Sequence, residues 1–144
     1  MKKDYSKIIK SNQVKPSYLR NSLVAFLVGG SIGLIGQGLS DTYINIFNMS
    51  KDNANSLMIV TLILLSALTT GFGIYDYLGQ FAGAGAFVPI TGFANSMTSA
   101  ALEGKSEGIT LGIGAGMFKL AGSVIVFGVV AAYILGTIRY LFGW

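Results

Sequence analysis

The chain has 144 residues, of which 52% are hydrophobic and only 11% are charged, against about 25% charged residues in a typical soluble domain. Its 10 Lys and Arg and 6 Asp and Glu residues are too few to cover the surface of a soluble domain of this size, which argues against a soluble globular enzyme. There is no Cys and no His, which excludes disulfides, thiolate nucleophiles and cysteine zinc sites and removes the usual general base.

Positive charge is concentrated at the start of the chain. Residues 1–20 contain six Lys and Arg residues and one acid, a net charge of +5, whereas residues 21–144 contain four cations and five acids, a net charge of −1. Cytoplasmic segments beside membrane spans are enriched in Lys and Arg. We therefore predict a basic cytoplasmic arm over residues 1–20, lying against membrane lipid, and a single transmembrane domain over residues 21–144. A surface for nucleic acid would need more basic and aromatic residues.

Two uncharged apolar stretches follow the arm. Residues 21–40 are long enough to cross a hydrocarbon core, which takes about 20 apolar residues. A secretory signal peptide is the alternative, but the run is long for one and no A-x-A pattern follows it. Residues 41–52 predict a polar connector, and residues 53–75 contain SLMIVTLILLSAL, the most hydrophobic stretch of the chain. Both stretches predict helices, because backbone exposed to lipid must satisfy its own hydrogen bonds.

The next uncharged stretch, residues 77–102, has a different character. It contains Pro89 and four glycines, including Gly83 and Gly85. Proline removes a backbone donor and clashes with the preceding turn, and glycine costs about 1 kcal/mol relative to alanine inside a helix. Such a stretch is tolerated at membrane depth where it is buried in protein or lines a cavity. We predict a broken or re-entrant helix pair with its break at residues 83–89.

The end of the chain predicts a short charged loop at residues 103–107 and a last apolar stretch at residues 108–138, followed by Arg139. The fold class is therefore all-α, a polytopic membrane protein of about four transmembrane segments, one of them broken by Gly and Pro or re-entrant. If residues 77–102 cross fully, Arg139 lies on the cytoplasmic side, which the positive-inside rule favours. If they re-enter, the C-terminus lies outside.

Small and amide side chains mark helix faces within these stretches. Gly29 and Gly33 form a G-x-x-x-G pair, and Gly112 and Gly116 form another. Small faces let helices approach closely in lipid, so we predict helix packing at both pairs, with oligomer contacts or pore lining as alternatives. Gln37 lies one turn after Gly33, and a primary amide in lipid needs several hydrogen-bond partners.

Lys119 is the single charge inside the last apolar stretch. A cation at the centre of a membrane helix costs at least about 2.5 kcal/mol unless it snorkels, pairs or meets water. Lys119 is either an interfacial anchor, if the span begins near Phe118, or a cavity-lining cation that meets an anionic solute. Glu103 and Glu107 carry oxygen ligands for a hard cation, but two carboxylates on a polar loop are more often a solvated turn. We predict no metal, no cofactor and no catalytic residue.

Several long motifs of the chain are unusual in sequence. Three of them lie in and before the glycine-rich stretch: GFGIYD at residues 71–76, QFAGAG at 80–85 and VPITGFANS at 88–96. Three more are AFLVGG at 25–30, IGQG at 35–38 and MFKLAG at 117–122. Together they resemble the SpoVA family of membrane proteins from endospore-forming bacteria, and more narrowly its SpoVAC branch, over roughly residues 20–140.

The resemblance implies a subunit of a spore inner-membrane complex that takes up dipicolinic acid, with calcium, in sporulation and releases it in germination. It also implies partners from the same family, SpoVAEb and the thiolase-like SpoVAD, in a hetero- or homo-oligomer. For a channel subunit, our hypothesis is a solute pathway lined by Lys119, Gly83, Gly85, Pro89, Asn95 and Gln37. The alternative is a structural membrane scaffold that only anchors its partner proteins.

Overall fold

The structure is a computed structural model that describes residues 17–143, and these are almost entirely helical. In chain order the helices are α2 (Tyr18–Phe47), α3 (Lys51–Gly71), α4 (Ile74–Ala82), α5 (Ala84–Phe87), α6 (Ile90–Gly104), the 3₁₀ turn η1 (Lys105–Glu107), the π-helical η2 (Ile109–Gly114) and α7 (Ala115–Phe142). The described residues include no strand, so the all-α prediction is confirmed.

Among the described residues, three helices are long and apolar enough to cross a membrane: Tyr18–Phe47, Lys51–Gly71 and the continuous stretch Ile109–Phe142. The fourth predicted segment, residues 77–102, is divided among α4, α5 and α6. The protein is thus a polytopic membrane protein with three long helices and one broken segment, as the sequence predicts. Residues 1–16 of the predicted arm lie outside the described residues, and Tyr18–Arg20 already belong to α2.

The first helix is longer than the sequence predicts. We expected a span ending at residue 40 and a polar connector over residues 41–52, but α2 continues to Phe47. Its last turns are polar yet well bonded: the Ser40 hydroxyl donates to Asn55 Oδ1 at 2.8 Å, and the hydroxyls of Tyr43 and Thr61 lie 2.9 Å apart. These bonds between α2 and α3 hold the helical conformation beyond the apolar span. The connector is therefore only three residues long, from Asn48 to Ser50.

The second helix is shorter than predicted. The uncharged run extends to Tyr75, but α3 ends at Gly71. Gly73 adopts a left-handed conformation, with φ 72°, and its N–H donates to the Thr70 carbonyl. An L-residue with a side chain rarely takes that φ, so this glycine ends the span and starts a new helix. Tyr75 therefore belongs to α4.

The break in the third segment falls where the sequence places it. Helix α4 ends at Ala82, Gly83 has φ 53° and ψ −123°, and Pro89 is extended at ψ 165° immediately before α6. Glycine alone reaches the first of these conformations without strain, and proline stops the helical ladder at the second. Ala82, Ala86 and Tyr75 form the buried apolar cluster of the molecule.

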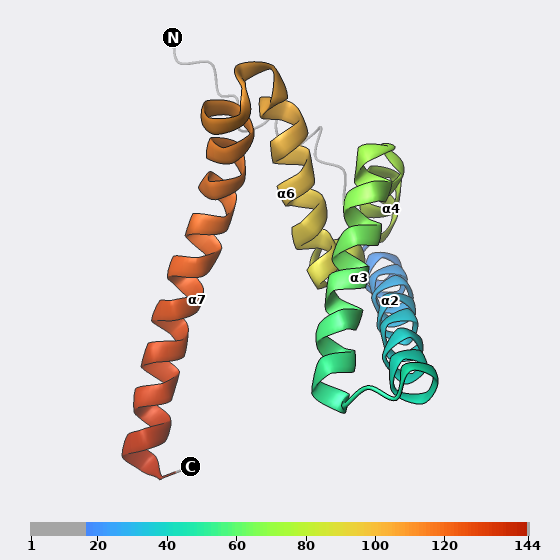
Figure 1. Ribbon diagram of the computed structural model, residues 1–144, viewed down its shortest axis with the longest axis vertical. Coiled ribbons are helices and arrows are strands. Elements are labelled where there is room, and N and C mark those ends of the chain that lie inside the picture. The colour runs from blue at the N-terminus through green and yellow to red at the C-terminus, as the bar shows by residue number, and fades with distance from the viewer. Residues whose placement is uncertain (1–16, 144) are drawn as a thin grey trace.

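Helix α6 lies between α3 and α7 and links the two halves of the structure (Figure 1). The residues expected as a charged loop, 103–107, are instead the end of α6 and the turn η1. The reversal is tight, because a Cβ on Gly104 would lie 2.5 Å from the Gly112 carbonyl oxygen. Beyond this hairpin α7 runs away from the other helices (Figure 1), and Ala121 is its one buried residue.

Candidate functional site

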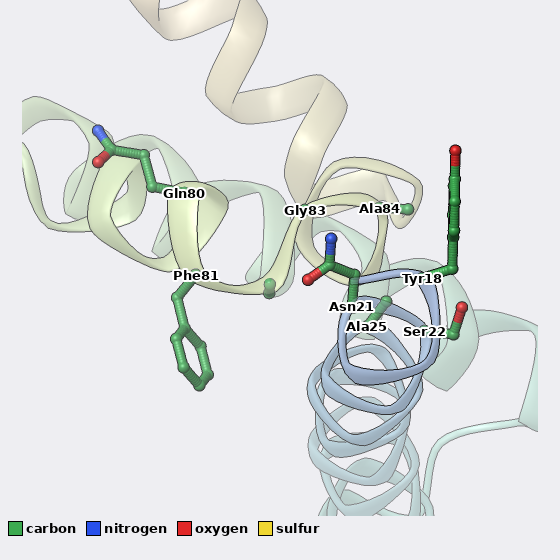
Figure 2. Close-up of a pocket in the computed structure, with 9 residues that line it drawn as sticks. Tyr18, Asn21, Ser22, Ala25, Gln80, Phe81, Gly83 and Ala84 are labelled. Carbon is green, nitrogen blue, oxygen red and sulfur yellow. The ribbon is translucent and has the colours of Figure 1, made fainter. Parts of the chain in front are cut away.

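A polar groove of about 370 Å³ lies between the first turn of α2 and the junction of α4 with α5. Its polar side chains are Tyr18, Asn21, Ser22 and Gln80. In Figure 2 the Asn21 amide lies beside the Gly83 turn, while Gln80 projects from α4 on the other side. The groove therefore presents hydroxyl and amide groups next to the break in the membrane segment.

Close backbone contact between α2 and α5 forms one wall of this region. A Cβ on Gly85 would collide with the Ala25 carbonyl oxygen and would lie 2.7 Å from Ala25 Cα. A Cβ on Gly29 would lie 3.3 Å from the Gly85 oxygen. A larger residue at either position would force α2 and α5 apart. Gly29 and Gly85 thus bring the break against the first span.

A buried polar network joins α3 to α6 on the inner side of the break. The Ser66 hydroxyl donates to the Thr91 carbonyl at 2.6 Å. The Thr70 hydroxyl lies 2.7 Å from both the Ser66 carbonyl and Asn95 Oδ1. All four residues are buried. Because a hydroxyl has one proton, Thr70 donates to only one of these two oxygens; with the Asn95 amide turned so that its Nδ2–H donates to Thr70, both contacts are hydrogen bonds.

Tyr75 connects this network to the break. Its hydroxyl lies 2.8 Å from the Ala86 carbonyl oxygen and 2.8 Å from Thr91 Oγ1. In the part of the chain that the structure describes, every buried side-chain nitrogen and oxygen atom has a hydrogen-bond partner. The hydrogen bonds of the network are therefore complete within the protein in this conformation, and a polar solute would have to break some of them.

Lys119 lies elsewhere, in a groove of about 620 Å³ at the α6–α7 hairpin, and is exposed. Glu103 and Glu107 line the same groove. Lys119 and Arg139 are separated by 19 uncharged residues, so their Cα atoms are about 30 Å apart along the helix, the thickness of a hydrocarbon core. This spacing favours an interfacial depth for Lys119 rather than a position at the centre of the membrane.

The predicted site residues do not form one site. Gly83 lies at the polar groove, Gly85 lies against Ala25 of α2, and Asn95 lies in the buried network. Gln37 is exposed and donates from Nε2 to Asp41 Oδ1 on its own helix. Pro89 lies near Gln37 in a shallow groove that Gly33 also lines.

The two glycine pairs also differ. Gly29, Gly112 and Gly116 lie at close helix contacts, whereas a Cβ on Gly33 would have no neighbour within 4 Å. Gly112 packs against Gly104, and Gly116 against the Ala100 carbonyl, where α7 meets α6.

Sequence reasoning did not single out Tyr75, Thr91, Asn21 or Gln80. Tyr75 stood at the end of an uncharged run and was read as part of the second span. The signal that separates it is the Gly71-Phe-Gly73 spacing just before it, which is typical of a helix C-terminus. No local signal indicates that a tyrosine on one helix bonds a carbonyl eleven residues later.

Fold and site together define a polytopic, all-α membrane protein with polar side chains buried around a broken helix. Comparison with known proteins is consistent with this class. The profile of the SpoVAC/SpoVAEB sporulation membrane protein family matches residues 21–138. Stage V sporulation protein AC of Bacillus subtilis (strain 168) is 61% identical over 142 residues, which cover 99% of this chain and 95% of that protein. No solved structure matches significantly.

The chain belongs to the SpoVAC/SpoVAEB family of sporulation membrane proteins. The resemblance stated from the sequence motifs is thereby confirmed. The family is described as one of sporulation membrane proteins.

Proposed function

We propose that this protein is a subunit of a membrane channel that passes dipicolinic acid, with calcium, into the forming spore and out of it at germination. The observation that carries the proposal is the broken segment α4–α5–α6, which has an exposed polar groove and a buried polar network beside its break in an otherwise apolar membrane protein. Broken helices at membrane depth are typical of solute pathways. The proposed location is the spore inner membrane, with the N-terminus cytoplasmic.

The residues offer the polar groups that a small dicarboxylate needs. Asn21 and Gln80 present amide donors at the groove, and Lys119 supplies positive charge at an interfacial mouth. A dianion that leaves water requires such compensation, because an unpaired charge is costly in a low-dielectric environment. The polar groove and the Lys119 groove share no lining residue, so a complete pathway requires either a conformational change or neighbouring subunits.

One observation favours the alternative function, a membrane scaffold. The long exposed face of α7 makes few contacts in this chain, since Ala121 is its one buried residue. A surface of this kind suits packing against partner proteins, and SpoVAEb and SpoVAD are the partners that we propose. The protein then holds an assembly together and passes no solute by itself.

Flux through liposomes separates the two functions. Vesicles that contain the purified chain and dipicolinate should release it faster than empty vesicles, measured by absorbance after rapid filtration. Lys119→Met should reduce dipicolinate flux and leave the flux of a neutral solute of similar size unchanged, and Lys119→Arg should retain most of it. A scaffold gives no flux above empty vesicles. Equal effects of Lys119→Met on both solutes would make Lys119 an anchor and not part of the pathway.

A further inference from the structure

Helix α4 is a nine-residue segment with a glycine link at each end. Gly73 precedes it with φ 72°, and Gly83 follows it with φ 53° and ψ −123°. At neither glycine would a Cβ have a heavy atom within 4 Å, so both links lie in open space. Links of small residues in unusual backbone conformations are where helices rotate in hinge motions. The geometry therefore gives α4 two pivots.

One side chain of α4, Tyr75, makes hydrogen bonds to the rest of the broken segment. Tyr75 is 5% exposed, and its hydroxyl reaches both the Ala86 carbonyl and Thr91 Oγ1 at 2.8 Å. In an uninterrupted helix the Ala86 carbonyl would accept a bond from the residue four positions later. The extended backbone at Pro89 ends that ladder, and the Tyr75 hydroxyl satisfies the carbonyl that the break leaves open.

Tyr75 also stands between the polar groove and the buried network. Ala82 lines the groove and packs with Tyr75 and Ala86 in one buried cluster. On its other side Tyr75 contacts Thr91, whose carbonyl is bonded to Ser66 in the network. A movement of α4 that breaks the tyrosine bonds would expose polar groups on both sides of this cluster.

We propose that α4 is a hinged gate and that the Tyr75 hydroxyl is the latch that holds it closed, so that loss of its bonds to Ala86 and Thr91 joins the groove to the buried network. The role of the gate in solute passage rests on the channel function proposed above. The hinge rests on the two glycine links of α4, and the latch rests on the bonds from Tyr75 to Ala86 and Thr91, so neither depends on the channel function.

A cysteine reporter tests the latch, since the chain has no natural Cys. The Ala82 side chain is 2% exposed, so a cysteine introduced by Ala82→Cys should react slowly with a water-soluble thiol reagent in liposomes. Adding Tyr75→Phe should raise that reaction rate about fivefold, because one net hydrogen bond corresponds to a factor of this size. Thr91→Val removes one of the two latch partners and should give a smaller rise.

Two matched controls separate the latch from general loosening. Tyr43→Phe makes the same chemical change and also removes a bond between helices, to Thr61 at 2.9 Å, but not on α4. It should leave the Ala82→Cys rate unchanged. Ala121→Cys reports on the buried contact of α7 and should be unaffected by Tyr75→Phe. Equal increases at both reporters, or no increase at Ala82→Cys, would overturn the latch.

Dipicolinate flux in the same vesicles distinguishes failure of the latch from failure of the channel function. If Tyr75→Phe raises reporter reactivity and flux together, both proposals are supported. If reactivity rises and no variant passes solute, the channel function fails and the latch stands. If the unsubstituted chain passes solute and Tyr75→Phe changes neither measurement, the latch fails and the channel function stands.

Discussion

The contact of Gly85 with α2 makes a sharp prediction about stability. A Cβ on Gly85 would lie 2.7 Å from Ala25 Cα and closer still to the Ala25 carbonyl oxygen, whereas carbon atoms in ordinary contact are about 3.5–4.0 Å apart. Gly85→Ala therefore requires α2 and α5 to separate by about 1 Å. Overpacking of this kind costs about 1–3 kcal/mol, and we expect the free energy of unfolding to fall by that amount.

The assay is denaturant unfolding in detergent micelles, followed by circular dichroism. Gly33→Ala is the matched control, because a Cβ there meets nothing within 4 Å and alanine favours the helix by about 1 kcal/mol. That control should be neutral or stabilising, so the difference between the two variants isolates the α2–α5 contact. Similar stability of both variants would refute the close approach of these two helices.

Two further predictions address topology and the hairpin. Single cysteines placed by Ser6→Cys and Ser106→Cys are expected to react with a membrane-impermeant reagent from opposite sides of the vesicle, and reaction from the same side would contradict a full crossing by the broken segment. Gly112→Ala is expected to lower the free energy of unfolding more than Gly122→Ala, because a Cβ on Gly112 meets the Gly104 carbonyl whereas a Cβ on Gly122 would have no neighbour within 4 Å. The same unfolding assay compares the two variants, and equal effects would contradict the tight turn between α6 and η2.

The sequence predicted the features that depend on composition and on single residues. Long apolar runs identify α2, α3 and α7, because a lipid-exposed backbone must be helical. The break at residues 83–89 was predictable in the same way, since glycine permits backbone conformations that other residues avoid and proline interrupts a helix wherever it stands. These effects are local, so no knowledge of neighbouring helices is needed to predict them.

Features that depend on contacts between helices were not predictable in the same way. Helix α2 continues beyond its apolar span because Ser40 and Tyr43 form hydrogen bonds to partners on α3. Gly29 and Gly33 look alike in sequence, yet only Gly29 meets another helix, because α5 crosses α2 at that turn. The predicted site residues lie in different parts of the structure for the same reason, because the spacing of residues along a chain does not indicate which helix each of them contacts.

The bond between Thr70 and Asn95 gives a last prediction: the two partners should cost different amounts of stability when each is replaced alone. Thr70→Val removes the hydroxyl that lies 2.7 Å from Asn95 Oδ1, and Asn95 is only 4% exposed. The amide is then left without this partner in a buried site, at a cost of about 1–3 kcal/mol. Asn95→Leu is milder, about 0.6 kcal/mol, the average for such bonds in membrane helices, because the Thr70 hydroxyl keeps its bond to the Ser66 carbonyl.

A double-mutant cycle on these two residues measures the coupling directly. With Thr70→Val and Asn95→Leu together, no polar group of the pair remains unsatisfied, so the double variant should be more stable than the sum of the single losses implies, by about 0.5–3 kcal/mol. The measurement is the same denaturant unfolding, applied to the four proteins side by side. Strictly additive losses would mean that the two side chains do not exchange a hydrogen bond in the membrane protein. The Ser66–Thr91 hydrogen bond and side-chain packing would then hold α6 against α3 without a contribution from Thr70 and Asn95.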